Sequence, residues 1–210
     1  MFRPMLPRSW GNKLLPPLHI VRRSSFKRSP WKNGGGITHE AMRVPATGDP
    51  FLWRVSVAQI DSSGPFSDFA GYDRKMVLLQ GPGIELIHGN GQHRVLRNVG
   101  DCVEFAGAIP THCELLGGPC VDLNLIVAES LRSTARVERL VDGLIATADG
   151  ETTLIFGMES PLSLESDAGE TVRLEPWDLA VLSQGSARLK NMTPDQRSTP
   201  SAVFIATISH

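Results

Sequence analysis

Val77-Leu78-Leu79-Gln80-Gly81 is a short apolar run closed by a glycine, and it recurs in outline as Thr153-Leu154-Ile155-Phe156-Gly157, 76 residues further along the chain. Later segments keep a separation of 76 to 78 residues, matching Ile84-x-Leu86 with Leu162-x-Leu164 and Val95 with Val172. Short apolar runs separated by Gly, Asp or Asn turns are typical of antiparallel barrels rather than of alternating strands and helices. The sequence therefore predicts an all-β protein with two stacked jelly-roll barrels.

The repeat also predicts how the chain is divided. Residues 1–17 contain four prolines and no continuous apolar segment, so we expect a loose N-terminal extension and no secretion signal. We expect residues 18–130 to form the first barrel and residues 131–210 a second, degenerate one, sharing or exchanging an edge strand. A helical connector is expected between the barrels, around residues 128–140.

The glycine triplet lies in Trp31-Lys32-Asn33-Gly34-Gly35-Gly36-Ile37-Thr38-His39-Glu40. Three consecutive glycines indicate an unusual backbone path or the close approach of another group. The flanking aromatic, cationic and amide side chains are unlike those of a flexible linker. Two interpretations stay open: a loop that contacts a ligand, and a loop whose tryptophan packs into the core.

Two further segments follow. Phe51–Ile60 alternates in period two, with Trp53, Val55 and Val57 on one face and Arg54, Ser56 and Ala58 on the other, which is typical of a half-buried strand. Gly64–Arg74 is rich in turn-forming and aromatic residues.

These segments carry a resemblance to a known family. The motifs W-K-N-G-G-G-x-T, W-R-x-S-x-A, G-P-F-S-x-F-x-G-Y-D-R and D-L-N-L stand in this order between Ile20 and Ser130. They resemble the HutD/Ves family, bacterial cytoplasmic proteins with a double-cupin fold that are linked to histidine utilisation. The resemblance implies a double cupin here, with few short helices. His39 departs from the pattern, because the family usually has arginine at that position.

The first repeat also resembles a cupin metal-binding barrel. Gly100-Asp101-x-Val103-x-Phe105, followed by Ile109-Pro110-Thr111-His112, is similar to the second cupin signature, whose histidine often binds a metal. A metal site needs converging donors, usually a His-x-His pair and a carboxylate. None of the six histidines lies two residues from another. We therefore expect no bound metal and no cofactor, with His112 as a core or pocket-lining residue.

Composition restricts the partners. The chain has 210 residues, a net charge of −1 and 41% hydrophobic residues, which gives no bulk attraction to nucleic acid or membrane. It contains no apolar run long enough to span a bilayer. Three cysteines cannot all pair within one chain, so we expect free thiols and a cytoplasmic location. A homodimer stays open.

The candidate ligand site draws on three segments and a fourth strand. The positively charged cluster favours a small anion, because Arg54 presents a planar fork to a carboxylate and Lys32 adds a point charge. The expected ligand-binding residues are Trp31, Lys32, Asn33, Gly34, Gly35, Thr38, His39, Arg54, Ser56, Phe66, Ser67, Tyr72, Arg74, His112, Asp122 and Asn124. Two alternatives remain: Arg54 pairs with Asp73 or Glu40 and only ties strands together, and Asp122 and Asn124 belong to a solvated strand face.

Two classes of function follow. The first is a small-molecule-binding protein, a sensor or regulator that binds an anionic metabolite without converting it. The second is a metal-independent enzyme, an isomerase, hydrolase or lyase, with Tyr72, His112 or Lys32 as acid or base. The sequence has no catalytic triad motif and no paired carboxylates, which favours binding. The link to histidine breakdown, and with it urocanate or N-formylglutamate as ligand, comes from the resemblance alone.

Overall fold

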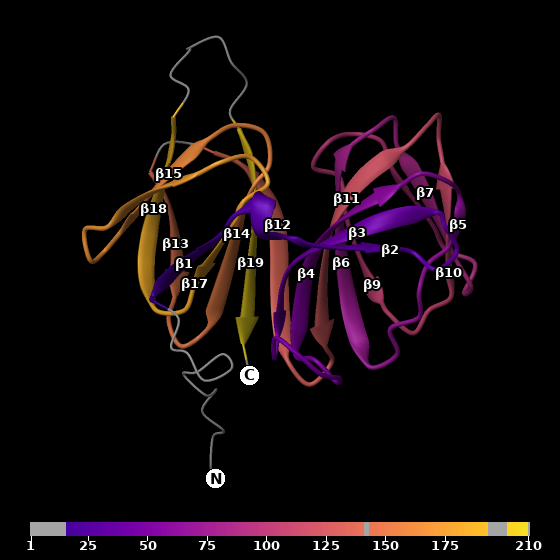
Figure 1. The fold of residues 1–210 in the computed structure, drawn as a ribbon, viewed down its shortest axis with the longest axis horizontal. Coiled ribbons are helices and arrows are strands. Elements are labelled where there is room, and N and C mark those ends of the chain that lie inside the picture. The colour runs from indigo at the N-terminus through magenta and orange to yellow at the C-terminus, as the bar shows by residue number, and fades with distance from the viewer. Residues whose placement is uncertain (1–15, 141–142, 193–200, 210) are drawn as a thin grey trace.

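The computed structural model describes residues 16–140, 143–192 and 201–209. In these ranges the chain forms nineteen β-strands and one short 3-10 helix, η1 (Arg23–Ser25), arranged as two antiparallel barrels that lie side by side (Figure 1). The predicted double cupin is confirmed. The predicted loose extension, residues 1–17, lies almost wholly outside the described residues.

The first barrel is built from a six-stranded sheet and a four-stranded sheet. The larger sheet has the order β2-β3-β4-β11-β6-β9, with the bounds Lys27–Pro30, Gly36–Val44, Trp53–Ile60, Cys120–Ala128, Tyr72–Gln80 and Cys102–Ala106. The smaller sheet has the order β5-β10-β7-β8, with the bounds Gly64–Pro65, Thr111–Leu115, Ile84–His88 and His93–Leu96.

The second barrel repeats this plan with five and four strands. Its larger sheet has the order β1-β17-β14-β19-β12, with the bounds Leu18–Val21, Leu179–Leu182, Thr152–Gly157, Ala202–Ser209 and Arg132–Arg139. Its smaller sheet has the order β13-β18-β15-β16, with the bounds Leu144–Ala148, Gly185–Asn191, Leu162–Ser166 and Thr171–Leu174. Strands β6 to β11 of the first barrel therefore correspond in order and pairing to β14 to β19 of the second.

The match between β6 and β14 needs a shift of one residue from the 76-residue offset. Leu78 faces the core of the first barrel, and the residue of β14 that faces the core of the second barrel is Ile155, 77 positions later. Because successive side chains of a strand point to opposite faces, an offset of 76 would exchange the two faces. The sheet faces, not the closing glycines, set the true correspondence.

Two segments differ from the expected division of the chain. Leu18–Val21 were placed in the first barrel, but β1 pairs with β17 at the edge of the second barrel. The expected helix at residues 128–140 is also wrong, because Arg132–Arg139 form strand β12, which pairs with β19 over its whole length. The exposed and half-buried side chains of β12 alternate, and this edge position fixes a segment without a strongly apolar pattern as a strand.

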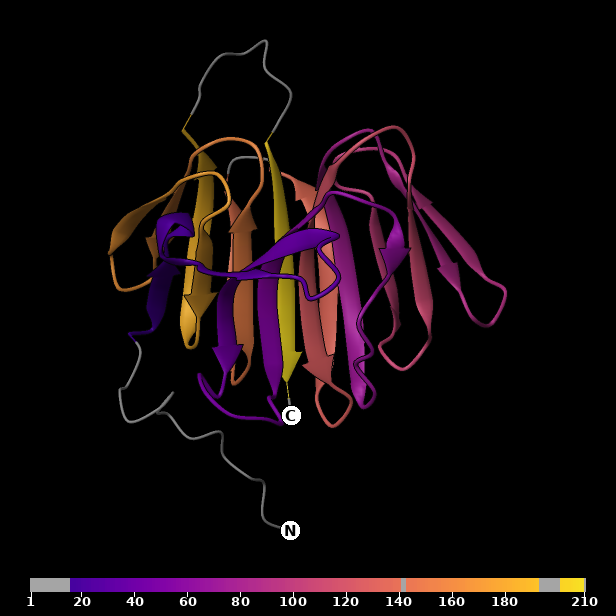
Figure 2. The same ribbon diagram turned by 45° about the vertical axis from the view of Figure 1, so that its right-hand side comes forward.

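The two barrels are joined by an apolar layer between their larger sheets. Trp53, Val55 and Leu125 from the first barrel pack in one cluster with Phe156 and Phe204 from the second. In the turned view, purple strands of the first barrel overlap the yellow β19 in the middle of the molecule, as for two sheets packed face to face (Figure 2). Each barrel has in addition its own inner core. The large sheet of the first barrel therefore has one apolar outer face and one inner face that is free to be polar.

Candidate functional site

The inner face of the first barrel carries the polar residues of three adjacent strands. On β4 the residues Val55 and Val57 pack in the layer between the barrels, so Arg54 and Ser56 point the other way, into the first barrel. The same alternation on β11 directs Asp122 and Asn124 inward. Because β11 pairs with both β4 and β6, these side chains meet above one patch of the sheet.

A cavity of about 520 Å³ opens over this patch. It is lined by Ser29, Pro30, Trp31, Lys32, Asn33, Thr38, Arg54, Ser56, Ala58, Pro65, Phe66, Ser67, Phe69, Arg74, Asp122, Asn124 and Ile126. Arg74, Asp122, Asn124 and Ser56 are buried and form the floor, whereas Lys32, Asn33 and Ser67 are exposed and stand at the mouth. We name this the barrel cavity. Its size is that of a pocket for one small ligand.

Arg74 is the central cation of the floor. Its guanidinium lies 5.0 Å from the ring centroid of Phe66, 5.4 Å from that of Phe69 and 5.1 Å from that of Phe105. Its Nη2 donates a hydrogen bond of 2.7 Å to Oδ1 of Asn124, while its buried Nε has no hydrogen-bond partner. Burial, and to a lesser degree the nearby Arg54, lowers the pKa of Arg74 to about 10, although Asp122 acts in the opposite direction. The group is still charged at neutral pH, and it is short of acceptors.

Asp122 completes the network through Asn124. The amide Nδ2 of Asn124 donates to Oδ2 of Asp122, and Oδ1 of Asp122 is buried without a partner. Burial raises the pKa of Asp122 to about 7, against the opposing influence of Arg74 and of the hydrogen bond from Asn124. The carboxyl group therefore changes its protonation near neutral pH. The alternative that Asp122 and Asn124 form a solvated strand face is excluded, because both side chains are buried.

Arg54 has a protein partner. Its Nε lies 2.7 Å from Oε2 of Glu40 on β3, at the edge of the cavity, and both side chains are about one-fifth exposed. The N–H bond does not point at the carboxylate oxygen well enough for a hydrogen bond, so the contact is an ion pair without ideal geometry. Arg54 thus ties β3 to β4, as one of the two interpretations predicted, and it also lines the cavity.

The glycine triplet shapes one wall of the barrel cavity. Gly34 has a φ of +73°, and a Cβ on Gly36 would lie 2.3 Å from the carbonyl oxygen of Gln59, so neither position accepts a side chain without strain. This path brings Trp31 against Phe66, with ring centroids 6.3 Å apart, while Trp31 Nε1 donates to Thr38 Oγ1 at 2.8 Å. Both interpretations of the loop therefore hold, because Trp31 packs on the core and also lines the cavity.

Five of the sixteen expected residues do not line the barrel cavity. Gly34 and Gly35 shape the loop from behind, and Gly35 N–H is held by Oδ1 of Asn33. His39 follows Thr38 on β3 and therefore faces away, into a second cavity between the barrels. Tyr72 stacks on Phe51, with ring centroids 4.3 Å apart, and its hydroxyl accepts from the Phe51 N–H.

His112 is the fifth. Thr111 and Cys113, its neighbours on β10, are buried, so alternation turns His112 outward, where it contacts Glu114 at 2.9 Å. The predicted pocket-lining role of His112 is therefore wrong.

Sequence reasoning missed several lining residues, namely Ser29, Pro30, Ala58, Pro65, Phe69 and Ile126. Alternation could have found two of them, since Ala58 follows Arg54 and Ser56 on one face, and Ile126 follows Asp122 and Asn124. The others lie in β2 and in the loop of β5, where no periodic pattern marks the inner side.

The donor set does not fit a metal ion. In residues 16–140, 143–192 and 201–209 no three His, Cys, Asp or Glu side chains come together in a metal-binding arrangement. The barrel cavity instead holds two arginines and a lysine beside a single aspartate. Cations in that position repel a metal ion and attract an anion. No step of the proposed chemistry below therefore involves a metal.

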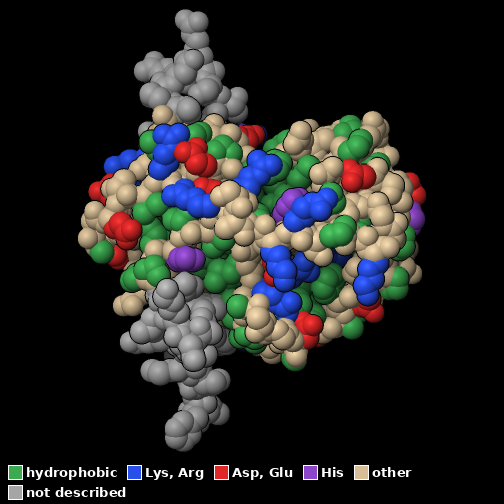
Figure 3. Space-filling model, in the orientation of Figure 1, with side chains coloured by type: hydrophobic (Ala, Val, Ile, Leu, Met, Phe, Trp, Pro, Cys, Tyr) green, Lys and Arg blue, Asp and Glu red, His purple; other side chains and the backbone are tan. Residues whose placement is uncertain are grey.

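Positive charge extends outside the cavity. Segment 22–32 carries Arg22, Arg23, Lys27, Arg28 and Lys32, and on the face seen in Figure 3 lysine and arginine side chains gather along and beside the seam between the barrels. Such a surface attracts anions to the mouth of the cavity. Within the described ranges, no helix has the length and hydropathy needed to cross a membrane.

Comparisons with known proteins agree with this architecture. The chain is 38% identical over 162 residues to an uncharacterized 21.2 kDa protein in the hutC 3' region of Pseudomonas putida, covering 77% of this chain and 84% of that protein. It is 32% identical over 161 residues to the protein Ves of Cronobacter sakazakii, covering 76% and 84%.

Solved structures show the same fold. A conserved protein of unknown function from Pseudomonas aeruginosa PAO1 superposes with a TM-score of 0.81 at 32% identity, covering 92% of this chain and 99% of that one. HutD from Pseudomonas fluorescens SBW25, solved in a formate condition, gives 0.69 at 30% identity, covering 91% and 97%. Oxalate decarboxylase of Bacillus subtilis gives 0.62 at 7% identity, covering 90% and 76%, a likeness of fold alone.

The family profile of HutD matches residues 23–198, which include both barrels and every residue that lines the barrel cavity. With relatives above 30% identity over three quarters of its length, the chain belongs to the HutD family.

Proposed function

We propose that this protein binds a small carboxylate in the barrel cavity and acts as a sensor or regulator rather than as an enzyme. The observation that carries the proposal is the buried Arg74, whose guanidinium is charged, covered by three aromatic rings, and satisfied only in part by Asn124. A buried cation without an adequate partner is costly, and a ligand carboxylate supplies the missing acceptors.

The cavity chemistry also limits the ligand. Arg74 and Arg54 lie close enough for each to disfavour the other's charge, so an anion between them relieves repulsion. Lys32, Asn33 and Ser67 at the mouth offer a second polar contact region, which suits a ligand with a second polar group. The aromatic walls of Trp31, Phe66 and Phe69 suit a short apolar or conjugated stem.

The physiological context comes from relatives. The P. putida protein is described by its position in the hutC 3' region, and the P. fluorescens protein is named HutD. These names support a role in histidine utilisation. Urocanate and N-formylglutamate, two carboxylates of that route, are therefore the first ligands to test, with formate and acetate as the smallest carboxylates.

Isothermal titration calorimetry on the full chain tests the proposal. We expect at least one of the four carboxylates to bind, and Arg74→Met to weaken it by roughly 1.5–3 kcal/mol, because one charge-assisted contact is lost. Lys32→Gln, at the exposed mouth, should weaken binding less and guards against misfolding of the Arg74 variant. Arg28→Gln removes one charge from the same segment but lines no cavity, and should bind like the wild type.

Binding that is unchanged in both Arg74→Met and Lys32→Gln, with each variant folded by circular dichroism, would place the anion elsewhere. No heat with any of the four carboxylates at millimolar concentration would contradict the proposal itself.

One observation favours the enzymatic alternative. Asp122 is buried in the cavity floor with a pKa of about 7, which is the range in which a carboxyl group serves as a general acid or base at neutral pH. If the protein is an enzyme, Asp122 is its best acid–base candidate, in place of Tyr72 and His112, which lie outside the cavity. Loss of any observed turnover in Asp122→Asn, with ligand binding retained, would support this alternative.

A further inference from the structure

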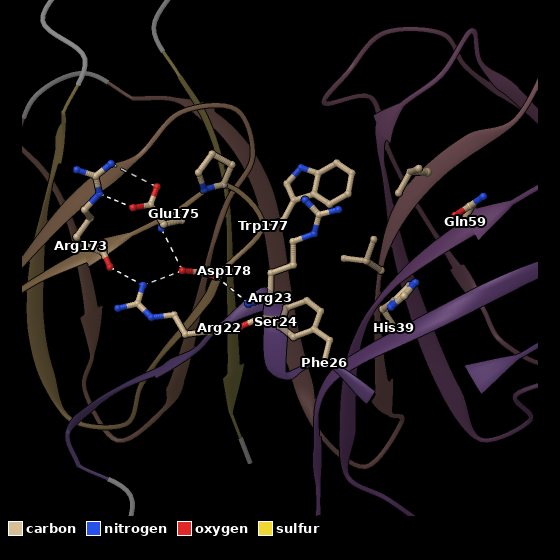
Figure 4. A pocket seen from close by; sticks show the side chains of 13 residues that line it. Arg22, Arg23, Ser24, Phe26, His39, Gln59, Arg173, Glu175, Trp177 and Asp178 are labelled. Carbon is tan, nitrogen blue, oxygen red and sulfur yellow. Dashed lines mark hydrogen bonds and ion pairs between the residues drawn. The ribbon is translucent and has the colours of Figure 1, made fainter. Parts of the chain in front are cut away.

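A second, larger cavity of about 710 Å³ lies between the two barrels. We name it the inter-barrel cleft. One wall is formed by η1 and by the turn before β17, and the other by strands β3, β4 and β11 of the first barrel. In the close view, Trp177, Arg23 and Phe26 stand on one side of the opening, and His39 and Gln59 on the other (Figure 4).

The charges in the inter-barrel cleft do not balance within the protein. Arg22 Nη1 lies 2.7 Å from Oδ2 of the buried Asp178, and Arg173 pairs with Glu175. Each carboxylate that lines the cleft is thus engaged by its own arginine. Arg23 has no carboxylate partner for its side chain in the described ranges, although its backbone N–H donates to Asp178 at 2.7 Å. The cleft therefore holds one guanidinium that is free to meet an anion.

Arg23 is held in a defined position by Trp177. Its guanidinium carbon lies 4.2 Å from the centroid of the indole ring, a stacked contact that leaves the N–H groups at the edge of the fork available. Trp177 itself has a φ of +69°, the one positive value of a non-glycine residue among the described residues. Its Nε1 donates to the Met158 carbonyl at 3.1 Å, which fixes the ring in the cleft.

A tryptophan kept in an unfavourable backbone conformation, with its ring against an unpaired arginine, is typical of a binding site rather than of a packing region. The remaining surface is apolar, since Phe26, Val57 and Val121 line the cleft between Trp177 and His39. We propose that the inter-barrel cleft is a second ligand site, for a small planar aromatic or conjugated carboxylate. The fork of Arg23 binds the carboxylate, and the flat body lies among Trp177, Phe26 and the two valines.

This site is separate from the barrel cavity although the two share a wall. On β3, Thr38 faces the barrel cavity and His39 the cleft, and on β4 the same holds for Ser56 and Val57. His39 is the position at which this chain departs from the arginine of similar sequences. The departure therefore changes the cleft and leaves the lining of the barrel cavity intact.

The test uses 2-naphthoate as probe and 2-naphthamide, which has the same rings without the charge, as its control. Calorimetry is run on the full chain and on four variants that each remove one basic side chain: Arg23→Gln and His39→Gln in the cleft, Lys32→Gln in the barrel cavity, and Arg28→Gln in neither. We expect the wild type to bind 2-naphthoate at least about tenfold more tightly than 2-naphthamide. Arg23→Gln should weaken 2-naphthoate roughly tenfold and His39→Gln severalfold, while Lys32→Gln and Arg28→Gln stay within about twofold.

Three results would overturn the proposal. Equal losses in Arg23→Gln and Arg28→Gln would show attraction to the basic surface rather than a site. A loss in Lys32→Gln with none in Arg23→Gln would assign the probe to the barrel cavity, which would support the proposed function and remove this one. No binding of 2-naphthoate to the wild type at millimolar concentration would remove this site while leaving the test with small carboxylates untouched.

Discussion

The two barrels have one topology and opposite interiors. In the first, the residue of β11 opposite Leu78 is Asp122, whereas in the second, the residue of β19 opposite the equivalent Ile155 is Ile205. The inner core of the second barrel is aliphatic throughout its cluster, with Leu164, Leu182 and Leu189 beside Ile205. One barrel is thus filled by its own side chains, while the other keeps a polar floor and a cavity.

The difference shows what a polar interior requires. Arg74, Asn124 and Asp122 are joined in one hydrogen-bonded row, and aromatic rings cover the guanidinium. Even so, two buried polar atoms remain without partners, Nε of Arg74 and Oδ1 of Asp122. An unpartnered buried polar atom costs free energy, so the first barrel gives up stability where the second does not. We infer that the second barrel is the stabilising half and the first the functional half.

The strongest test of this comparison moves the charge into the other barrel. Ile205→Asp places a carboxyl group in an aliphatic core with no arginine or amide beside it. We expect a loss of at least about 4 kcal/mol in the free energy of unfolding, or no folded protein. Urea unfolding followed by circular dichroism measures it. Ile205→Val is the matched control and should cost about 1 kcal/mol. A loss below about 1 kcal/mol for Ile205→Asp would mean that the second interior tolerates charge.

The next effect concerns pH. The pKa of Asp122 is raised by burial from 3.8 to about 7, so the folded state holds this proton more tightly than the unfolded state. Its stabilising contribution is complete below pH 4 and is lost as the pH rises through 7. From pH 5 to pH 8 we expect Asp122 to reduce the free energy of unfolding by on the order of 2 kcal/mol.

His88 works in the opposite direction. Burial lowers its pKa from 6.5, with Arg94 and His93 adding to the effect, so its contribution is present above pH 6.5 and is lost as the pH falls. The difference between wild type and Asp122→Asn separates the two groups, because both proteins keep His88. Parallel pH profiles for the two proteins would show that Asp122 does not titrate in this range.

Much of this comparison could be read from the sequence. Period-two patterns and the repeat predicted both barrels, and the same patterns predicted eleven of the residues that line the barrel cavity. The errors have physical causes. Thr38 and His39 are neighbours on one strand and cannot share a cavity, and Tyr72 belongs to an aromatic corner with Phe51.

The rest depends on long-range pairing. β1 joins the second barrel through a contact between residues about 160 positions apart, and no local pattern reveals such an exchange. The inter-barrel cleft was missed for the same reason, because Arg23 and Trp177 become neighbours only once both barrels have formed. Sequence patterns identify the face on which a residue lies, but not the distant segment that covers that face.

The two arginines of the barrel cavity sharpen the comparison further. Arg54 was the expected ligand partner, but Glu40 already pairs with it, whereas Arg74 has no ion pair among the described residues. We therefore expect Arg54→Met to weaken carboxylate binding by less than about 1 kcal/mol, against roughly 1.5–3 kcal/mol for Arg74→Met. Calorimetry with the tightest of the four carboxylates measures both. A larger loss for Arg54→Met would restore the assignment made from the sequence.

The smallest effect tests whether the exchanged N-terminal segment holds the barrels together. Arg22, directly after β1, pairs with Asp178 of the second barrel at 2.7 Å and also donates to the Arg173 carbonyl at 2.7 Å. The arginine side chain is 46% exposed, so solvent screens the pair, and we expect Arg22→Gln to cost about 0.5–1 kcal/mol. Arg28→Gln, on the exposed strand β2, is the matched control and should cost less than about 0.5 kcal/mol. Urea unfolding of both variants measures the difference. If Arg22→Gln cost more than about 2 kcal/mol, the link between β1 and the second barrel would depend on this one ion pair. A loss within the expected range means instead that strand pairing and the buried Leu18 hold the segment, which would make the exchange a property of the β-sheet rather than of its charges.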